Sequence, residues 1–520
     1  MMLPQMLALM LGVILLGIVL LCIYAVRDVY RKQGSNLPPG PRGLPLLGNL
    51  LQVPSKFTWY KLDDWSKQYG PIYTLWMMGR PFVVLNSVAV AADILDRNSG
   101  ATADRFKTIK SMFYTSDSFV SLQDHTIEWR GERRAIHSNL NIRSTVRFLF
   151  LQENEAAYFT LGLLRYPDKA FDVHAHRFAG SSIFRSLYGG ERFNHLKEDP
   201  SRLIEKMHKE VMHAMLPQNS IVDMLPFLEP LIQRVKWLRR AADTWFREMT
   251  QEGYRLFDTA APTEDWEPIV QNFNMNREKY GITKHNAVWT TVTLYMAGQE
   301  TTSTALRVCM LALLHHPEVM RAAQANIDAI CGMHPPKFED RDKLPYIDAL
   351  VKETVRWRPG IPPGIPHVAS ETFQYQQYTI PKGTVFFDNI WGQTRDPLVY
   401  PNSEVFNPTR FLDKSGKLLP VTPDTRLDLL GFGHGRRVCP GKDFAVNGMF
   451  IAIAYMLWAF TFEWPLDDAG QPIKCDVNDF VDHSFVASPR SFGVLVKPRR
   501  EDLEGLLVEV LNQYDAQHKV

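Results

Sequence analysis

The sequence contains few cysteines for its length and lacks any C-x-x-C pair. The scarcity excludes a disulfide-stapled mini-protein, and the missing pair excludes a zinc knuckle or a dithiol redox motif. The five cysteines are Cys22, Cys309, Cys331, Cys439 and Cys475. Because they are scattered and odd in number, we interpret them as free thiols in a reducing compartment.

The chain also lacks an excess of charge and lacks the common nucleotide and hydrolase motifs. Lys and Arg number 58 against 56 Asp and Glu, a formal charge of +2, so nothing in the balance favours a nucleic-acid partner. We find no G-x-G-x-x-G after a strand, no P-loop and no G-x-S-x-G elbow. The chain therefore carries no nicotinamide or flavin fingerprint of its own.

Hydrophobic residues, in contrast, are plentiful at 45% of 520 residues, enough for a large core. Residues 71–78 and 81–85 flank Gly79-Arg80 and predict a β-hairpin, and an alternating run predicts further strands in 372–388. Helical periodicity covers most of 87–314, with loops near 111–124 and 216–230, and returns from 439 to about 457. With no linker or repeat inside 56–500, the pattern predicts one large domain there, mainly α with minor β.

An uncharged, apolar run covers residues 6–26. At about 1.5 Å per residue, a helix of this length spans a bilayer core about 30 Å thick. We therefore predict a single transmembrane anchor with a basic flank in residues 1–30. A secretory signal is the alternative, but no Lys or Arg precedes the run. Arg27, Arg31 and Lys32 follow it, which favours a cytosolic position for the remaining chain.

Two flanking segments complete the predicted organisation. Residues 31–55 include the proline-rich stretch 37–45, and its prolines favour a stiff, extended hinge. Residues 501–520 form an amphipathic C-terminal tail. Its apolar residues follow i, i+3, i+4 spacing and are Leu503, Leu506, Leu507, Val510 and Leu511.

The stretch before and after Cys439 carries the strongest chemical signal. It reads Phe432-Gly433-His434-Gly435-Arg436-Arg437-Val438-Cys439-Pro440-Gly441. Pro440 is predicted at the first position of a helix, so the Cys439 sulfur is expected at a helix N-terminus, where a thiolate is favoured. The glycines allow a flat group to approach the backbone. The residues alone leave two interpretations open, a thiolate ligand of haem iron or a buried structural cysteine.

This stretch resembles the signature of the cytochrome P-450 family of haem-thiolate monooxygenases, F-x-x-G-x-R-x-C-x-G. The matching residues are Phe432, Gly435, Arg437, Cys439 and Gly441. The resemblance implies the fold of that family, haem b as cofactor, and the Cys439 thiolate as axial ligand of the iron. It extends from the anchor to about residue 500 and is similar to fungal microsomal members of the O-methylsterigmatocystin oxidoreductase type.

Two motifs extend the resemblance beyond the cysteine loop. Glu353 and Arg356 stand at i, i+3 on a predicted helix, and with Arg410 they resemble the family's structural ion-pair network. The same spacing occurs in Glu252 and Arg255, so alone it indicates only a solvated pair.

The segment 297–302 resembles the family's oxygen-activation segment. By this resemblance Glu300 and Thr301 deliver protons during catalysis. From the pattern alone, an ordinary buried helix with a packing glycine is the alternative. Threonine hydroxyls here are expected to bond back to a carbonyl one turn earlier.

The resemblance also assigns partners to the haem propionates. Trp129 and Arg133 match a W-x-x-x-R helix, and His367 and Arg437 match two further propionate contacts. Residues expected to face the substrate by analogy are Phe113, Ala297, Ile365 and Phe485. They are apolar or small, which indicates a lipophilic small molecule.

A monooxygenase of this kind needs electrons from outside the chain. The resemblance implies NADPH-cytochrome P-450 reductase as donor, with cytochrome b5 as a further candidate partner, on the endoplasmic reticulum membrane. A basic patch for such a partner consists of Arg130, Arg133, Arg134, Arg436 and Lys442. The expected reaction is oxidation of a terpenoid, polyketide or alkaloid in secondary metabolism. The alternatives are a haem-thiolate isomerase or dehydratase that needs no dioxygen, and a non-catalytic haem-binding membrane protein.

Overall fold

The computed structural model describes residues 36–518, except 46, 78, 195–209, 216–219, 225–228, 261–265, 422–429 and 484. The predicted anchor, residues 1–30, and the beginning of the predicted hinge lie outside the described residues. Within the described ranges, no helix has the length and apolar character needed to cross a bilayer.

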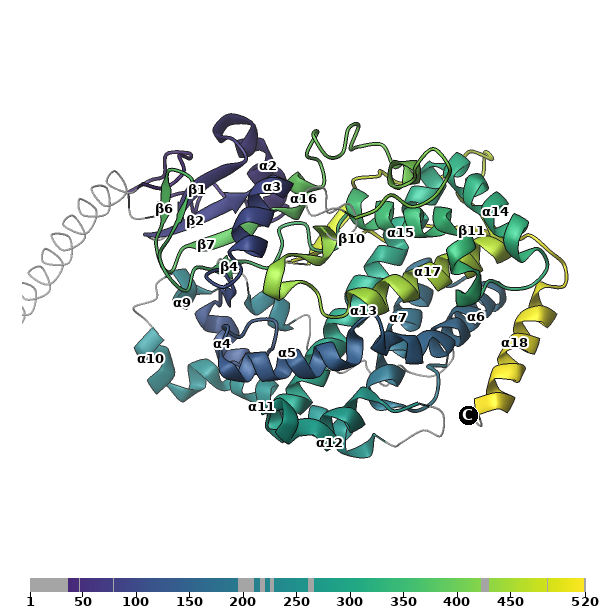
Figure 1. Ribbon diagram of the computed structural model, residues 1–520, viewed down its shortest axis with the longest axis horizontal. Helices are drawn as coiled ribbons and strands as arrows, with labels where there is room; N and C mark the ends of the chain where they lie inside the picture. Colours follow the sequence, from purple (N-terminus) through teal and green to yellow (C-terminus); the bar gives the residue numbers. More distant parts are fainter. Residues whose placement is uncertain are drawn as a thin grey trace, which may run out of the picture.

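Helices make up most of the described chain (Figure 1). The helices are α2 (Thr58–Tyr69), α3 (Val88–Ala91), α4 (Ile109–Thr115), α5 (Ile127–Leu140), α6 (Leu149–Arg165), α7 (Phe171–Tyr188), α9 (Ile221–Met224), α10 (Glu229–Arg234), α11 (Lys236–Thr259), α12 (Ile269–Tyr280), α13 (Lys284–His315), α14 (Pro317–Cys331), α15 (Pro345–Trp357), α16 (Ile390–Gln393), α17 (Lys442–Ala459) and α18 (Leu503–His518). The mainly α prediction is confirmed.

The strands form a small part of the structure, gathered largely beside α2 (Figure 1). The main sheet has the order β1-β2-β7-β4-β3, in which only β2 and β7 run parallel. Its strands are β1 (Ile72–Met77), β2 (Arg80–Leu85), β7 (Val385–Asp388), β4 (His367–Val368) and β3 (Asp104–Arg105). The predicted hairpin is confirmed as the antiparallel pair β1 and β2.

Three two-stranded ribbons complete the β structure. They pair β5 (Phe373–Tyr375) with β6 (Tyr378–Ile380), β8 (Phe460–Glu463) with β11 (Leu495–Pro498), and β9 (Phe480–His483) with β10 (Val486–Pro489). Together, β5, β6 and β7 confirm the strands predicted in 372–388.

One expected loop contains a helix. Residues 111–124 were expected to be irregular, but α4 occupies their first part because Thr108 caps it. The Thr108 hydroxyl accepts the Ser111 N–H at 3.0 Å, which satisfies one of the free donors of the first turn. In the second expected loop, 216–230, the described residues are also largely helical, because α9 covers 221–224 and α10 begins at Glu229.

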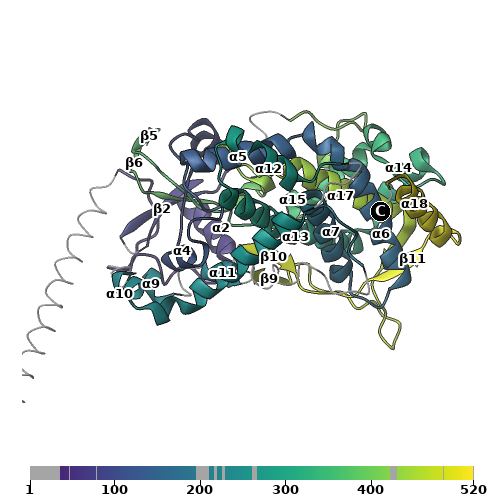
Figure 2. The same ribbon diagram turned by 90° about the horizontal axis from the view of Figure 1, so that it is seen from below.

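Helix α13 runs through the middle of the helical region and packs on α7, α11, α12 and α17 (Figure 2). Its beginning is set by a capping box, in which the Thr283 hydroxyl accepts the Asn286 N–H at 3.1 Å and the Asn286 side chain accepts the Thr283 N–H. Its end falls before Pro317, because a residue that precedes proline avoids the helical conformation.

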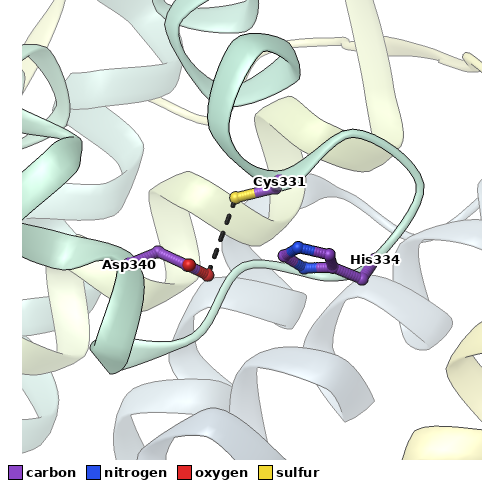
Figure 3. A group of neighbouring side chains, drawn as sticks. All are labelled: Cys331, His334 and Asp340. Carbon is purple, nitrogen blue, oxygen red and sulfur yellow. Dashed lines mark hydrogen bonds between the residues drawn. The ribbon is translucent and has the colours of Figure 1, made fainter.

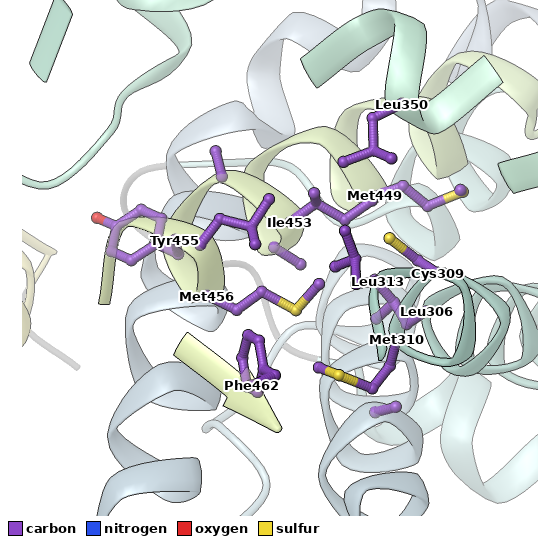
Figure 4. Close-up of a cluster of buried hydrophobic side chains, with 14 of the residues drawn as sticks. Leu306, Cys309, Met310, Leu313, Leu350, Met449, Ile453, Tyr455, Met456 and Phe462 are labelled. Atoms are coloured by element: carbon purple, nitrogen blue, oxygen red, sulfur yellow. The ribbon is translucent and has the colours of Figure 1, made fainter. Parts of the chain in front are cut away.

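The largest apolar cluster joins α13 to α15, α17 and β8 (Figure 4). Side chains from these elements interdigitate there, and all are almost fully shielded from water. The labelled members are Leu306, Cys309, Met310, Leu313, Leu350, Met449, Ile453, Tyr455, Met456 and Phe462. Burial on this scale, at roughly 25 cal/mol per Å² of apolar surface, fixes α17 against α13.

The predicted amphipathic tail forms α18, which packs against α6. Its buried face consists of Leu503, Leu507, Leu511 and Tyr514. Two ion pairs also hold α18, one between Glu504 and Arg165 of α6 at 2.7 Å and one between Asp515 and Arg192, which follows α7, at 2.6 Å. The tail is therefore part of the folded domain.

Candidate active site

The Cys439 loop lies directly before α17. The Cys439 N–H donates to the Phe432 carbonyl at 2.8 Å, which closes the loop on itself. Helix α17 begins at Lys442 with Gly441 as its cap, so the prediction that Pro440 is the first helical residue is wrong by two residues. Gly441 has φ −92° and ψ 10°, outside the helical region, and this delays the helix.

The two signature glycines have different surroundings. Gly435 has φ +54°, and a Cβ there would lie 2.0 Å from the Leu95 carbonyl oxygen, so glycine is required by the close approach of a π-helical turn, 92–97. At Gly441 an added Cβ would meet no protein atom within 4 Å, although the residue is half-buried. Of the two, only Gly441 adjoins space that a flat group can use.

The local charges act on the Cys439 thiol in opposite directions. Burial raises the pKa of the Cys439 thiol above its usual range, whereas the Gly441 N–H and the cations of Arg133 and Lys442 lower it. Burial has the largest of these effects. A coordinated metal cation would add the positive charge that favours the thiolate.

The other described cysteines lack such surroundings. Cys309 is fully buried in the core, which raises the pKa of its thiol to about 12. Cys331 lies at the end of α14, and Cys475 lies between β8 and β9. Among the described cysteines, Cys439 alone is acted on by nearby cations that lower its pKa.

Cationic side chains gather beside this loop, together with a buried histidine. Arg105, Arg133, Arg437 and His367 come from β3, α5, the cysteine loop and β4. Burial, with the charge of Arg133, lowers the pKa of Arg105 to about 9 despite Asp388. Burial, with Arg105 and Arg133, lowers that of Arg437 to about 8. Burial and Arg105 also hold the pKa of His367 far below its usual value.

Backbone carbonyls hold three arginines that we call the cation cluster, Arg105, Arg133 and Arg437, and the neutral His367 beside it. Arg437 donates to Ala103 O and to Gln123 O, each at 2.6 Å, and Arg133 donates to Val438 O. The Nδ1–H of His367 donates to Thr102 O at 2.9 Å. These neutral acceptors orient the side chains without cancelling their charge.

Trp129 stacks against Arg437, one member of the cluster. The guanidinium carbon of Arg437 lies 3.9 Å from the centre of the Trp129 ring, a cation–π contact. The indole N–H of Trp129 donates to Val120 O at 3.0 Å. In this conformation Trp129 therefore positions Arg437 by stacking. The indole N–H of Trp129 is already bonded to Val120 O.

The cation cluster fits the carboxylates of a haem. An arginine keeps its charge in proteins, so the lowered pKa values mean that the cluster is unfavourably charged until an anion joins it. The buried Nε of Arg105 has no hydrogen-bond partner among the described residues, which leaves a donor for such an anion. Two propionates would match both the charge and the free donor.

Sequence reasoning missed Arg105. It enters the cluster because β3 pairs with β4, which sets Arg105 opposite His367. A guanidinium nitrogen of Arg105 also donates to Ile365 O, 260 residues along the chain. Its two-residue strand has no periodic pattern, so no local signal could have identified it.

Helix α13 presents Ala297 and Thr301 on an open part of its surface. Ala297 is exposed although Met296 and Gln299 beside it are buried. The Thr301 hydroxyl donates to Ala297 O at 2.7 Å, the back-bond that we predicted. Glu300 is half-buried and within electrostatic reach of Arg307.

The remaining predicted pocket residues lie on other elements. Phe113 is half-buried on α4 with the guanidinium of Arg239 5.5 Å from its ring centre. Ile365 and Phe485 are half-buried in the segments before β4 and β10.

The predicted structural network is brought together at the end of α15. Arg356 donates to both Glu353 carboxylate oxygens at 2.6 and 2.8 Å, and Arg410 donates to the same carboxylate at 3.1 Å. The Asn407 N–H adds a bond at 2.7 Å, and Glu353 is completely buried. The network ties α15 to the segment that precedes the cysteine loop.

Comparisons with known proteins agree with this geometry. Residues 38–488 match the sequence profile of the family Cytochrome P-450. Cytochrome P-450 monooxygenase 58 of Postia placenta is 37% identical over 501 residues, 95% of each chain. A cytochrome P-450 monooxygenase of Armillaria gallica is 36% identical over 505 residues, covering 95% of this chain and 96% of the relative.

Solved structures share the fold. A zebra fish cytochrome P-450 with progesterone superimposes with a TM-score of 0.70 at 24% identity, covering 85% of this chain and 99% of that one. A zebra fish cytochrome P-450 with abiraterone superimposes with a TM-score of 0.68 at 23% identity. That superposition covers 85% of this chain and 100% of the other.

The fold and the cysteine loop thus define a haem-thiolate enzyme. The chain belongs to the cytochrome P-450 family and is a monooxygenase of that family, with relatives in fungi. Members bind haem through a cysteine thiolate and receive electrons from a reductase.

Removal of Arg105 should weaken haem retention. Arg105→Leu deletes a buried charge and the free donor, so haem should pass to apomyoglobin at least several-fold faster than from the unaltered protein. Arg97→Leu is the control, because Arg97 is largely exposed and pairs with Asp93 on its own helical turn. Equal rates for Arg105→Leu and the unaltered protein would contradict the assignment.

Loss of Glu353 should destabilise the fold. Glu353→Ala leaves the buried Arg356 without its carboxylate partner. We therefore expect the free energy of unfolding, measured in urea by circular dichroism, to fall by about 3–5 kcal/mol. The matched control is Glu252→Ala, which breaks an i, i+3 pair whose Arg255 side chain is 56% exposed, and it should cost at most about 1 kcal/mol. A similar loss of unfolding free energy in both variants would show that the buried network stabilises the fold no more than the exposed pair does.

Proposed function

We propose that this monooxygenase binds haem b through the Cys439 thiolate and oxidises a lipophilic small molecule. The supporting observation is the combination of the Cys439 sulfur, the free space beside Gly441 and the uncompensated cation cluster. When bound, the haem supplies dioxygen activation. Cys439 would hold the haem through its sulfur, Arg105 and Arg437 would neutralise its carboxylates, and the neutral His367 would stand beside them as a polar neighbour.

The chain's own residues also manage protons and substrate. Thr301 carries a hydroxyl at the open surface of α13, and its bond to Ala297 O aligns it as a proton relay. Glu300, one residue earlier, exchanges protons with solvent. The small side chain of Ala297 leaves room for substrate, and Phe113, Ile365 and Phe485 supply apolar contacts that exclude water.

Electrons come, in this proposal, from NADPH through a separate flavoprotein reductase, with cytochrome b5 as a further donor. Arg130, Arg134 and Arg436 are exposed near the cysteine loop and offer a basic surface to an acidic partner. The apolar run 6–26 supports an anchor in the endoplasmic reticulum membrane with the catalytic domain in the cytosol.

The reaction we propose belongs to fungal secondary metabolism, on a terpenoid, polyketide or alkaloid. A haem-thiolate isomerase or dehydratase is the second candidate, and it would turn over without dioxygen. The Glu300 and Thr301 pair favours the monooxygenase, because an oxygen-independent reaction needs no such proton supply.

Cys439→Ser should abolish the thiolate spectrum. The reduced protein with carbon monoxide should absorb at about 450 nm because of thiolate ligation, and the variant should lose this band. Cys475→Ser should keep it, because Cys475 lies between β8 and β9 and the charges that act on its thiol are those of Asp479 and Asp476. Retention of the band by Cys439→Ser would end the assignment.

Thr301→Ala should uncouple electron transfer from product formation. In membranes supplied with reductase, NADPH and a substrate found by mass-shift screening, the variant should retain haem but release several-fold more hydrogen peroxide per NADPH. Thr301→Ser should restore coupling, and Thr302→Ala provides a neighbouring control. Unchanged coupling in Thr301→Ala would exclude the relay.

A further inference from the structure

Three metal-binding side chains converge where α14 ends, in a place that the proposed haem site does not use. Cys331 is the last residue of α14, His334 lies in the loop that follows, and Asp340 lies in the short 3-10 turn 338–343. One ligand atom from each lies within 4.8 Å of the other two. Figure 3 shows the three side chains directed into one common space.

This cluster is separate from the haem site. The Gly332 carbonyl accepts the indole N–H of Trp458 at 3.3 Å, and Trp458 is next to the last residue of α17. Cys439 precedes the first residue of the same helix. At about 1.5 Å rise per residue, the length of α17 separates the two places by about 25 Å.

The side chains are already oriented by bonds to the backbone. The Asp340 carboxylate accepts the Lys337 N–H at 3.0 Å and lies 3.8 Å from the Cys331 sulfur. His334 Nδ1 lies 3.2 Å from Pro335 O, so when Nδ1 carries the proton and donates it there, Nε2 keeps a free lone pair. A histidine that binds a metal through one ring nitrogen usually donates a hydrogen bond from its other ring nitrogen, often to a backbone carbonyl.

We propose that Cys331, His334 and Asp340 bind one zinc ion. A sulfur, an imidazole nitrogen and a carboxylate oxygen are the donor types of zinc sites, whereas magnesium and calcium prefer oxygen alone. The thiolate and the carboxylate together balance the two positive charges of Zn²⁺. Binding forms a zinc–sulfur bond and releases the thiol proton to solvent, and water fills the fourth position.

The burial of the three residues fits entry of the ion from solvent. Cys331 is only 2% exposed, Asp340 is half-buried and His334 is exposed. The ion would reach the cysteine from the side that His334 faces. The role we assign is structural, because the ion would join the end of α14, the loop that follows it and the turn 338–343.

Zinc binding would cross-link the segment that connects α14 to α15. The segment 331–343 joins these helices, and Arg341 within it pairs with Asp348 of α15 at 2.7 Å. Zinc would link both ends of the segment and so raise the temperature of unfolding of the haem-loaded protein.

The test is the zinc content of the purified haem protein. After treatment with EDTA, the protein is dialysed against zinc chloride and then against metal-free buffer, and zinc and iron are counted by mass spectrometry. We expect one zinc per haem iron. X-ray absorption at the zinc edge should show one sulfur at about 2.3 Å and lighter ligands at about 2.0–2.2 Å.

Variants separate this site from adventitious binding. Cys331→Ser and His334→Ala should each lose at least tenfold in zinc content, while Cys475→Ser and His137→Ala should match the unaltered protein. The carbon monoxide band at about 450 nm reports whether each variant is folded, and the exposed His334 provides a variant that leaves the core intact. Zinc lost on dialysis, an equal content in His334→Ala, or a zinc spectrum without sulfur would each overturn the proposal.

Discussion

Three positively charged side chains lie close together beside the cysteine loop, in surroundings that water hydrates poorly. Arg105, Arg133 and Arg437 are held by carbonyl oxygens, which orient a guanidinium but leave its charge intact. Like charges in a poorly hydrated place raise the free energy of the fold, so stability must be supplied elsewhere. A cofactor that carries two carboxylates relieves this repulsion, and the protein and its cofactor therefore stabilise each other.

The stability required comes from the helical core and from buried networks that are fully paired. Helices α13 and α17 share an apolar cluster that excludes water, and the Glu353 carboxylate satisfies donors from Arg356, Arg410 and Asn407. The result is a rigid support on both sides of the cysteine loop. Such a support holds charged side chains in place before any ligand arrives.

Much of this arrangement could be predicted from the sequence because its signals are local. The hairpin, the strands in 372–388 and the cysteine loop each depend on residues close together in the chain. Arg105 could not be found, because its place depends on the pairing of two-residue strands far apart in sequence. The start of α17 was placed too early, because the backbone of Gly441 overrides the preference of Pro440 for a first turn.

Helix α18 ends the described chain as an integral layer of the domain. Its leucines fill the surface of α6, and Asp515 neutralises Arg192, which also contacts Asn154 and the ring of Tyr158. A shortened version that stops at residue 500 would expose the apolar surface of α6 to water and leave Arg192 without its carboxylate partner. Expression designs for this enzyme should therefore retain the tail in full, and any purification tag placed there needs a flexible spacer.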